Sequence, residues 1–471
     1  MEISNAPGSG PSAPRSTEAA ADRTAGPPGE AAEPPEGDGP ARPPLPRDVR
    51  LFWTAHAADA LGTQASGVIL PLLLLGLGHS PATVGLIAGV STAAGLLLAP
   101  FAAIPADRGA RKPVMFWSAT VSALAMAGVT LSVATGTPPL ALLIAVVLVE
   151  RFSAAVYEAA ATGTVAMIAP PADYPRAVAG LQAGEQGALI LGPALGGALY
   201  QVSRALPFLA DALSYTVAAA LVRSLRSDLR PERDESDPER TESDLRPQRA
   251  DSDNDSAEKG TPSDARPRRL AAFTAELGAG LALVRTSPFL RLVLLWSTTV
   301  NGVIVTLFYG AVFTLQEGGH GGAPMGLVLG LAGAAGLAGS LAAPRLAGRI
   351  SAARLLVAVS WLLVPLAAGL ATAEGPWTYG ALFGVFCLLM PLVVVVLQSR
   401  AIQETPPHLQ ARVGAVLATS AGGAAALAPV LAGLFAAGAG TAAPAVLCSG
   451  VLALLALRTT AVRGRLRGAA G

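Results

Sequence analysis

Residues 176–197 read RAVAGLQAGEQGALILGPALGG, and residues 412–433 read RVGAVLATSAGGAAALAPVLAG. Each segment begins with an arginine, runs through small and apolar residues, and reaches a proline seventeen positions later, at Pro193 and Pro429. The equal offset indicates an internal duplication in which each copy contains a helix with a proline at the same depth. We therefore expect two matching halves around these segments.

The composition is that of a membrane protein. Of the 471 residues, 52% are hydrophobic and only 14% are charged, whereas soluble proteins contain roughly 25% charged residues. Apolar runs of roughly 18–30 residues, long enough to cross the hydrocarbon core as helices, occur six times before residue 224 and six times after residue 287. They lie near 51–77, 83–105, 113–134, 139–168, 176–201, 206–223, 288–315, 323–344, 353–374, 377–400, 411–438 and 441–462. The sequence predicts an all-α integral membrane fold, with twelve transmembrane helices in two pseudo-symmetric six-helix halves.

Polar segments separate the predicted units. Segments rich in Pro, Gly and charged residues, with no apolar run, cannot bury enough surface to fold. We predict a disordered cytoplasmic N-terminal tail, a six-helix half, a disordered charged cytoplasmic linker, a second six-helix half and a cytoplasmic tail, at 1–48, 49–223, 224–269, 270–462 and 463–471.

The predicted linker contains a degenerate repeat, SDLRPER from Ser227, SDLRPQR from Ser243 and SDARPRR from Ser263. The repeat has two interpretations, a docking motif or a solvated spacer. We favour the spacer, a tether without an apolar anchor, because mixed-sign repeats broken by proline are typical of spacers.

Basic residues cluster in the loops on one side of the predicted membrane protein. That side contains Arg108, Arg111, Lys112, Arg176, Arg345, Arg349, Arg354, Arg400 and Arg412, whereas the opposite loops contain one basic residue, Arg204. Because cytoplasmic loops carry the excess of Lys and Arg, we predict a multi-pass protein of the cell membrane with both termini cytoplasmic. A net charge of +1 gives no indication of a nucleic-acid partner.

Acidic residues at depth inside the predicted spans are confined to the first half. An ionised side chain at the bilayer centre costs roughly 2.5–3.5 kcal/mol on insertion scales, so each indicates a function or a partner. The acids are Asp59, Glu150, Glu158, Glu185 and Asp211, and the base is Arg151. A carboxylate facing a partly dry cavity favours its protonated form. We expect Asp59 and Glu185 to carry protons, with Glu150 the weaker candidate, Arg151 the counter-charge and Asp211 a partner of helix ends.

One loop resembles a family signature. Residues 103–112 read AIPADRGARK and resemble the Gly-x-x-x-Asp-Arg-x-Gly-Arg-Lys motif of the major facilitator superfamily, except that Ala103 and Ala110 replace both glycines. At a cytoplasmic junction between helices, opposite charges can hold two halves together and separate on reopening. The resemblance implies such a gate at Asp107, Arg108, Arg111 and Lys112.

A second motif resembles that of proton-coupled exporters in the same superfamily. It consists of Gly192, Pro193, Gly196 and Gly197 in the fifth span. Four further segments resemble the macrolide and siderophore exporter branch: PFLADALSY at 207–215, ELGAGL at 276–281, GSLAAPR at 339–345 and PHLQARV at 407–413. The resemblance implies a monomeric transporter without a cofactor or a metal.

These features favour proton-coupled efflux, by antiport, of a hydrophobic or amphipathic small molecule such as an antibiotic or natural product. Uptake or lipid flipping on the same fold remains an alternative, as does a membrane receptor that transports nothing. An enzyme is disfavoured, because the sequence contains no phosphate-binding Gly-x-x-x-x-Gly-Lys-Ser/Thr loop and no His-Glu-x-x-His metal motif. The expected partners are the substrate, protons and the lipid bilayer.

The charge asymmetry generates a test of orientation. In a variant lacking Cys387 and Cys448, a single cysteine near Gly319 is expected to react with an impermeant thiol reagent applied outside cells. A cysteine near Ser252 is expected to react only after permeabilisation. The reverse labelling pattern would contradict the predicted orientation.

Overall fold

The computed structural model describes residues 45–107, 111–136, 138–161, 164–227, 229, 280–320, 322–347, 350–406 and 409–468. The described residues between Leu45 and Gly468 form one compact unit. Within the described ranges the regular structure is helical, with no strand. The all-α class is therefore confirmed.

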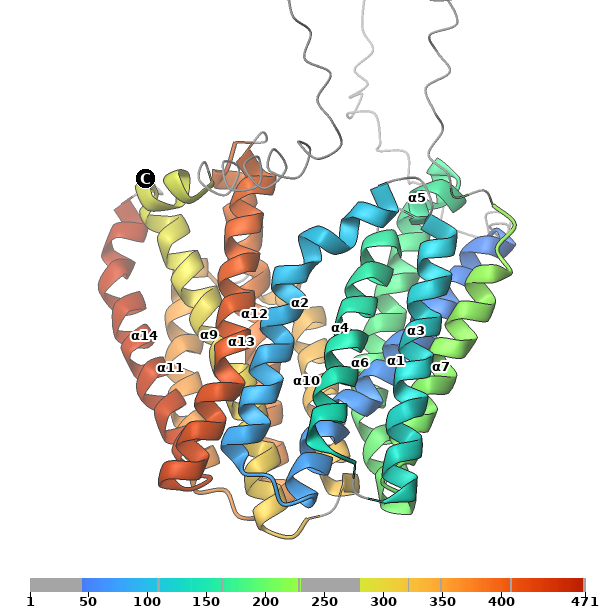
Figure 1. The fold of residues 1–471 in the computed structure, drawn as a ribbon. Coiled ribbons are helices and arrows are strands. Elements are labelled where there is room, and N and C mark those ends of the chain that lie inside the picture. The colour runs from blue at the N-terminus through green and yellow to red at the C-terminus, as the bar shows by residue number, and fades with distance from the viewer. Residues whose placement is uncertain are drawn as a thin grey trace, which may run out of the picture. The chain divides into compact units, whose positions relative to one another are not determined.

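In the described part of the chain, twelve long helices make up the two halves, and Figure 1 shows their arrangement. The first half contains α1 (Arg47–Gly76), α2 (Pro81–Asp107), α3 (Arg111–Thr135), α4 (Leu140–Ala161), α6 (Tyr174–Val202) and α7 (Leu206–Arg223). The second contains α9 (Pro288–Glu317), α10 (Gly322–Ala347), α11 (Ala352–Ala371), α12 (Gly375–Glu404), α13 (Gln410–Ala439) and α14 (Ala443–Gly468). Two short pieces, α5 (Thr164–Ile168) and the 3-10 turn Pro171–Asp173, connect α4 to α6.

Eleven helices in the described part of the chain are long and apolar enough to cross a membrane. The remaining long helix, α6, has 29 residues and corresponds to the span predicted at 176–201. Its hydropathy is lower because it carries Gln182, Glu185 and Gln186 among its apolar residues. Polar side chains in a helix of spanning length face the protein interior far more often than lipid.

The structure corrects several predicted boundaries. The run predicted at 139–168 is two helices, since α4 ends at Ala161 and α5 follows. The predicted tail 463–471 continues α14 to Gly468, and Arg47 and Asp48 of the predicted N-terminal tail form the first turn of α1. Hydropathy marks where a chain leaves hydrocarbon, and a helix can continue into water beyond that point. Residues 1–44 of the predicted N-terminal tail and residues 230–269 of the predicted linker lie outside the described residues.

The helices of the two halves pack in the same pattern. In the first half, α1 contacts α6 and α7, α3 contacts α4 and α7, and α2 contacts α4. In the second half, α9 contacts α13 and α14, α11 contacts α12 and α14, and α10 contacts α12. Each helix thus has an equivalent in the other half, which confirms the pseudo-symmetric halves expected from the duplicated segments.

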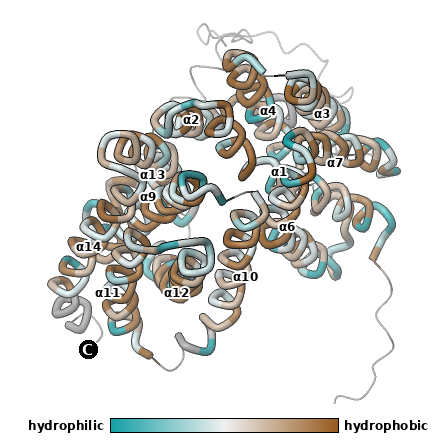
Figure 2. The backbone as a smooth tube through the Cα atoms, turned by 90° about the horizontal axis from the view of Figure 1, so that it is seen from below, coloured by the Kyte–Doolittle hydropathy of each residue, from teal (hydrophilic) through white to brown (hydrophobic). Residues whose placement is uncertain are grey.

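Two seams join the halves, α6 against α10 and α2 against α13, and Figure 2 shows each pair side by side. A Cβ atom added at Gly326 would overlap the carbonyl of Pro193, and one added at Gly85 would overlap the carbonyl of Pro429. The prolines of the duplicated segments therefore occupy equivalent grooves. Small residues allow such close backbone approach between membrane helices.

The same equivalence extends one turn along each seam. A Cβ atom at Gly197 would overlap the Gly322 carbonyl, and one at Gly433 would overlap the Pro81 carbonyl. Pro81 and Gly322 begin α2 and α10, so both seams lie toward the same end of the helices. We call that end of the helices the far side. Residues 47 and 468 lie at the opposite end, because twelve long helices connect them and an even number of helices returns the chain to the side where it began.

The seam geometry predicts an asymmetric response to added methyl groups. Gly85→Ala is expected to lower the thermal unfolding temperature in detergent, since forcing an atom into a packed contact costs roughly 1–3 kcal/mol. Gly95→Ala on the same helix is the control, because its Cβ would meet no atom within 4 Å. Equal unfolding temperatures for the two variants would contradict a close α2–α13 seam.

Candidate functional site

A cavity of about 680 Å³ lies between the halves. Residues of α1, α4 and α6 line it from one half, and residues of α9, α10 and α12 line it from the other. Most of its wall is apolar, and its polar side chains are Thr63, Gln64, Arg151, Gln186, Tyr309 and Ser340. This volume and this mixture of surfaces are typical of small-molecule sites.

A second groove, of about 590 Å³, runs along α3 and α4. Its lining includes Trp117 and Phe152, which are exposed apolar side chains. Because it belongs to one half and presents almost only apolar side chains, it is a lipid-facing surface. The cavity between the halves is therefore the candidate substrate site.

A chain of polar contacts connects two points on the cavity wall. Thr63 Oγ1 lies 3.0 Å from Tyr215 Oη, and Tyr215 Oη donates a hydrogen bond of 2.9 Å to Glu150 Oε1. The second oxygen of that carboxylate, Oε2, lies 3.4 Å from Arg151 Nε. Thr63 and Arg151 line the cavity, whereas Tyr215 and Glu150 are buried behind it. The cavity is thus linked to a buried carboxylate.

A second buried carboxyl group, that of Asp211 on α7, contacts α1. Ser66 Oγ donates a hydrogen bond of 2.5 Å to Asp211 Oδ2. A Cβ atom at Gly62 would lie 2.7 Å from Asp211 Oδ1, so glycine provides the space for the carboxyl group. Asp211 was expected to interact with helix ends, and it instead bonds to a side chain within the α1–α7 interface.

The predicted coupling residues separate into two groups. Asp59 on α1 interacts electrostatically with Asp211, Glu150 and Glu158, so helices α1, α4 and α7 bring these acids near one another. Glu185 lies elsewhere, with its Oε1 2.8 Å from Nε2 of His56. His56 lies on α1, three residues before Asp59, and its contact with Glu185 joins α1 to α6.

Tyr215, Ser66 and Thr63 were not predicted as site residues. Their signal in the sequence was weak, since hydroxyl side chains are common in apolar spans and often bond to their own helix. The clearest clue was Tyr215, which follows Asp211 by one helical turn inside the segment 207–215. Two polar side chains on one face of a short apolar span indicate a buried partner.

The predicted gate begins at the junction of α2 and α3. Asp107 is the last residue of α2, Arg108 lies outside the described residues, and Arg111 and Lys112 begin α3. Lys112 Nζ donates a hydrogen bond of 2.5 Å to the carbonyl oxygen of Leu225, just after α7. This bond lies within the first half, and the gate between the halves stays a prediction.

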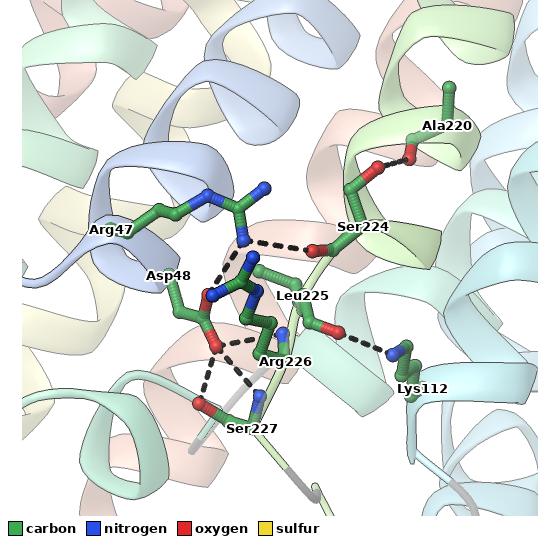
Figure 3. A network of polar contacts seen from close by, with 8 residues as sticks. All are labelled: Arg47, Asp48, Lys112, Ala220, Ser224, Leu225, Arg226 and Ser227. Carbon is green, nitrogen blue, oxygen red and sulfur yellow. Dashed lines mark hydrogen bonds and ion pairs between the residues drawn. The ribbon is translucent and has the colours of Figure 1, made fainter.

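The start of the predicted linker is bound to the first half (Figure 3). Asp48 Oδ2 accepts hydrogen bonds from the backbone nitrogens of Arg226 and Ser227, at 2.9 and 2.7 Å, and from Ser227 Oγ at 2.6 Å. Leu225 and Leu229 are buried in an apolar cluster with residues of α1 and α3. The prediction that this segment has no apolar anchor is therefore wrong at its beginning.

The exporter-type motif lies in a closely packed part of α6. Gly192 and Gly196 approach Gln64 and Ala65 of α1, and Gly197 approaches α10. Pro193 also lines the cavity. The motif therefore joins α6 to both halves at the edge of the cavity. Among the described residues, no group of three or more His, Cys, Asp or Glu side chains could hold a metal ion.

Comparison with known proteins places this geometry in context. The family model described as Major Facilitator Superfamily matches residues 52–429. No curated protein matches the sequence. Among solved structures, a bacterial homolog to the human lysosomal transporter Spinster, in an inward-facing and unoccupied conformation, is 13% identical. It has a TM-score of 0.63, and the alignment covers 88% of this chain and 96% of that one.

Two further structures are similar. The nucleoside transporter NupG is 12% identical with a TM-score of 0.62, covering 88% of this chain and 99% of its own. A bacterial homologue of the iron transporter ferroportin, in an inward-facing state, is 13% identical with a TM-score of 0.60, covering 87% and 98%. At these identities the likenesses concern the fold alone.

The anchor at Asp48 generates a prediction. Asp48→Asn is expected to destabilise the protein by about 1–3 kcal/mol, because a charged acceptor of three hydrogen bonds is lost. Trypsin cleavage after Arg226 is expected to accelerate as this segment detaches. Asp173→Asn, which removes a partly exposed ion pair with Arg176, is the control and is expected to change stability by less than about 1 kcal/mol. Unchanged cleavage after Arg226 in Asp48→Asn would show that other contacts hold the segment.

Proposed function

The chain belongs to the major facilitator superfamily, and on that premise we propose that it exports a hydrophobic or amphipathic small molecule in exchange for protons. It acts as a monomer in the cell membrane, with both termini in the cytoplasm. The observation that supports this proposal best is one cavity, formed by both halves, whose wall connects to buried carboxyl groups.

The seams support a mechanism of alternating access. The halves touch through Gly85 and Gly326 toward the far side, and the end of α2 toward the termini diverges from α13 (Figure 1). We therefore propose a cavity that is closed on the far side and open toward the termini, as in an inward-facing state. Rocking of one half against the other would reverse this access around a fixed site.

The buried acids support proton coupling. Asp59 interacts electrostatically with Glu150 and Asp211, and Glu150 pairs with Arg151. Acids that share a desolvated site cannot all remain ionised, so the cluster can take up a proton and release it when its surroundings change. The hydrogen-bonded pair of Glu185 and His56 is the second site that we propose for proton exchange. Asp59 and Glu185 remain the proposed carriers, and Glu150 contacts Arg151 at the cavity wall.

The available energy is sufficient for uphill export. A membrane potential of about 100 mV contributes roughly 2.3 kcal/mol for each proton, and one pH unit contributes about 1.4 kcal/mol. One proton exchanged for one neutral molecule could therefore sustain a gradient of roughly several hundred-fold.

Transport by purified protein in liposomes tests the proposal. With fluorescent amphipathic dyes and an imposed pH jump, the wild-type protein is expected to concentrate dye, whereas Asp59→Asn and Glu185→Gln are expected to lose uphill transport. Downhill exchange of dye should persist in at least one of the two variants. Glu374→Gln, at an exposed position before α12, is the control and should behave as the wild type.

Two outcomes would contradict the proposal. If both neutral variants still concentrate dye, the carriers are other residues or the coupling ion is not a proton. If dye moves only in the direction of the proton, the protein is an uptake transporter.

A further inference from the structure

We infer that the transported molecule is an amphipathic organic anion, whose negative group binds the guanidinium of Arg151. This inference rests on the proposed function for the location of the substrate, since it concerns the same cavity. It goes beyond that function by assigning the charge of the substrate and the residue that recognises it.

Arg151 has a distinct position on the cavity wall. Among the described residues that line this cavity, it is the sole charged side chain. Its side chain is 42% exposed, whereas that of the adjacent Glu150 is 6% exposed. The cation thus faces the cavity and its carboxylate partner lies behind the wall, so a substrate meets the positive end of the pair.

The guanidinium retains hydrogen-bonding capacity. It has five N–H donors in a rigid plane, and its ion pair in the described structure joins Nε to Glu150 Oε2 at 3.4 Å. The other oxygen of Glu150 already accepts from Tyr215. The two terminal NH₂ groups of Arg151 therefore remain for a ligand, and this planar edge matches a carboxylate in a bidentate geometry.

The other charged groups do not favour a cationic substrate at this wall. Asp59 and Asp211 are not among the residues lining the cavity, and Asp211 is already bonded to Ser66. A cation in the cavity would face the guanidinium directly, without a carboxylate beside it. A neutral apolar molecule would cover N–H donors without pairing them, which is unfavourable.

The remainder of the cavity accommodates an apolar body. Phe308, Phe383 and Met390 of the second half contribute to its wall. Tyr309 of α9 lines the same cavity as Arg151, from the other half. An organic anion can therefore place its charge on the first half and its apolar body against the second. Such a ligand contacts both moving parts of the transporter.

Binding of three matched ligands tests the inference. The full-length protein in lipid nanodiscs is titrated with 2-naphthoate, 2-naphthamide and 2-naphthylmethylammonium, which share one ring system and differ in charge. The wild-type protein is expected to bind naphthoate at least about tenfold more tightly than naphthamide, because only the carboxylate of naphthoate can form a charged bidentate pair with Arg151. The ammonium ligand should bind most weakly.

Variants of Arg151 identify the residue responsible. Arg151→Gln is expected to lose the preference for naphthoate while still binding naphthamide, which shows that the cavity is intact. Arg151→Lys should keep part of the preference, since the charge remains and the planar fork is lost. Arg204→Gln, at an exposed position between α6 and α7, is the control and should retain the full preference.

The inference is overturned if wild-type protein binds naphthoate no better than naphthamide, a result that needs no variant to fold. It is also overturned if Arg151→Gln keeps the preference. Proton-driven export of neutral dyes together with no preference for naphthoate would leave the proposed function standing and remove this inference. Arg151-dependent binding of naphthoate without any dye transport would support this inference and contradict the proposed function.

Discussion

The close approach of backbones at two glycine seams is the interaction on which this architecture depends. Membrane helices gain little from hydrophobic contact with one another, because lipid is equally apolar, so close packing holds them together. At both seams a proline carbonyl enters a groove that only glycine leaves open, at Gly85 and at Gly326. These contacts set the distance between the halves, and the cavity is the space that remains between them.

The cost of charge in a dry interior explains the second feature of the molecule. Two buried acids of the first half have specific partners, since Glu150 accepts a hydrogen bond from Tyr215 and Asp211 accepts one from Ser66. An uncompensated charge there would be expensive. The second half instead supplies apolar and aromatic side chains to the cavity. The halves therefore share a fold and differ in chemistry, with polar recognition on one and an apolar surface on the other.

The segment after α7 connects this chemistry to the membrane surface. Asp48 and Lys112 bind consecutive parts of residues 225–227, so the starts of α1 and α3 hold the same short segment. Lys112 also belongs to the family signature at the predicted gate. A change in the position of α3 during transport would therefore alter the contacts of the first residues of the linker.

The sequence by itself determined the number of spans, their division into halves and the equivalence of Pro193 with Pro429. These properties depend on local hydropathy and on residue spacing, which a linear chain displays directly. It also located Asp59, Glu150, Arg151 and Glu185 as charges inside the spans, because charge within an apolar run is visible without knowing its neighbours. Their roles in coupling stay predictions.

Only the tertiary structure decided the partners of these residues. His56 lies near Asp59 along the chain, yet it pairs with Glu185, 129 positions away. Asp211 bonds to Ser66 across 145 positions, and Tyr215 to Glu150 across 65. Hydropathy shows that a helix is in the membrane, whereas its rotation and its neighbours determine which side chains meet. The rotation and the neighbours of each helix depend on the packing of all twelve helices. The cavity and Arg151, the charged side chain on its wall, therefore became visible only in the folded protein.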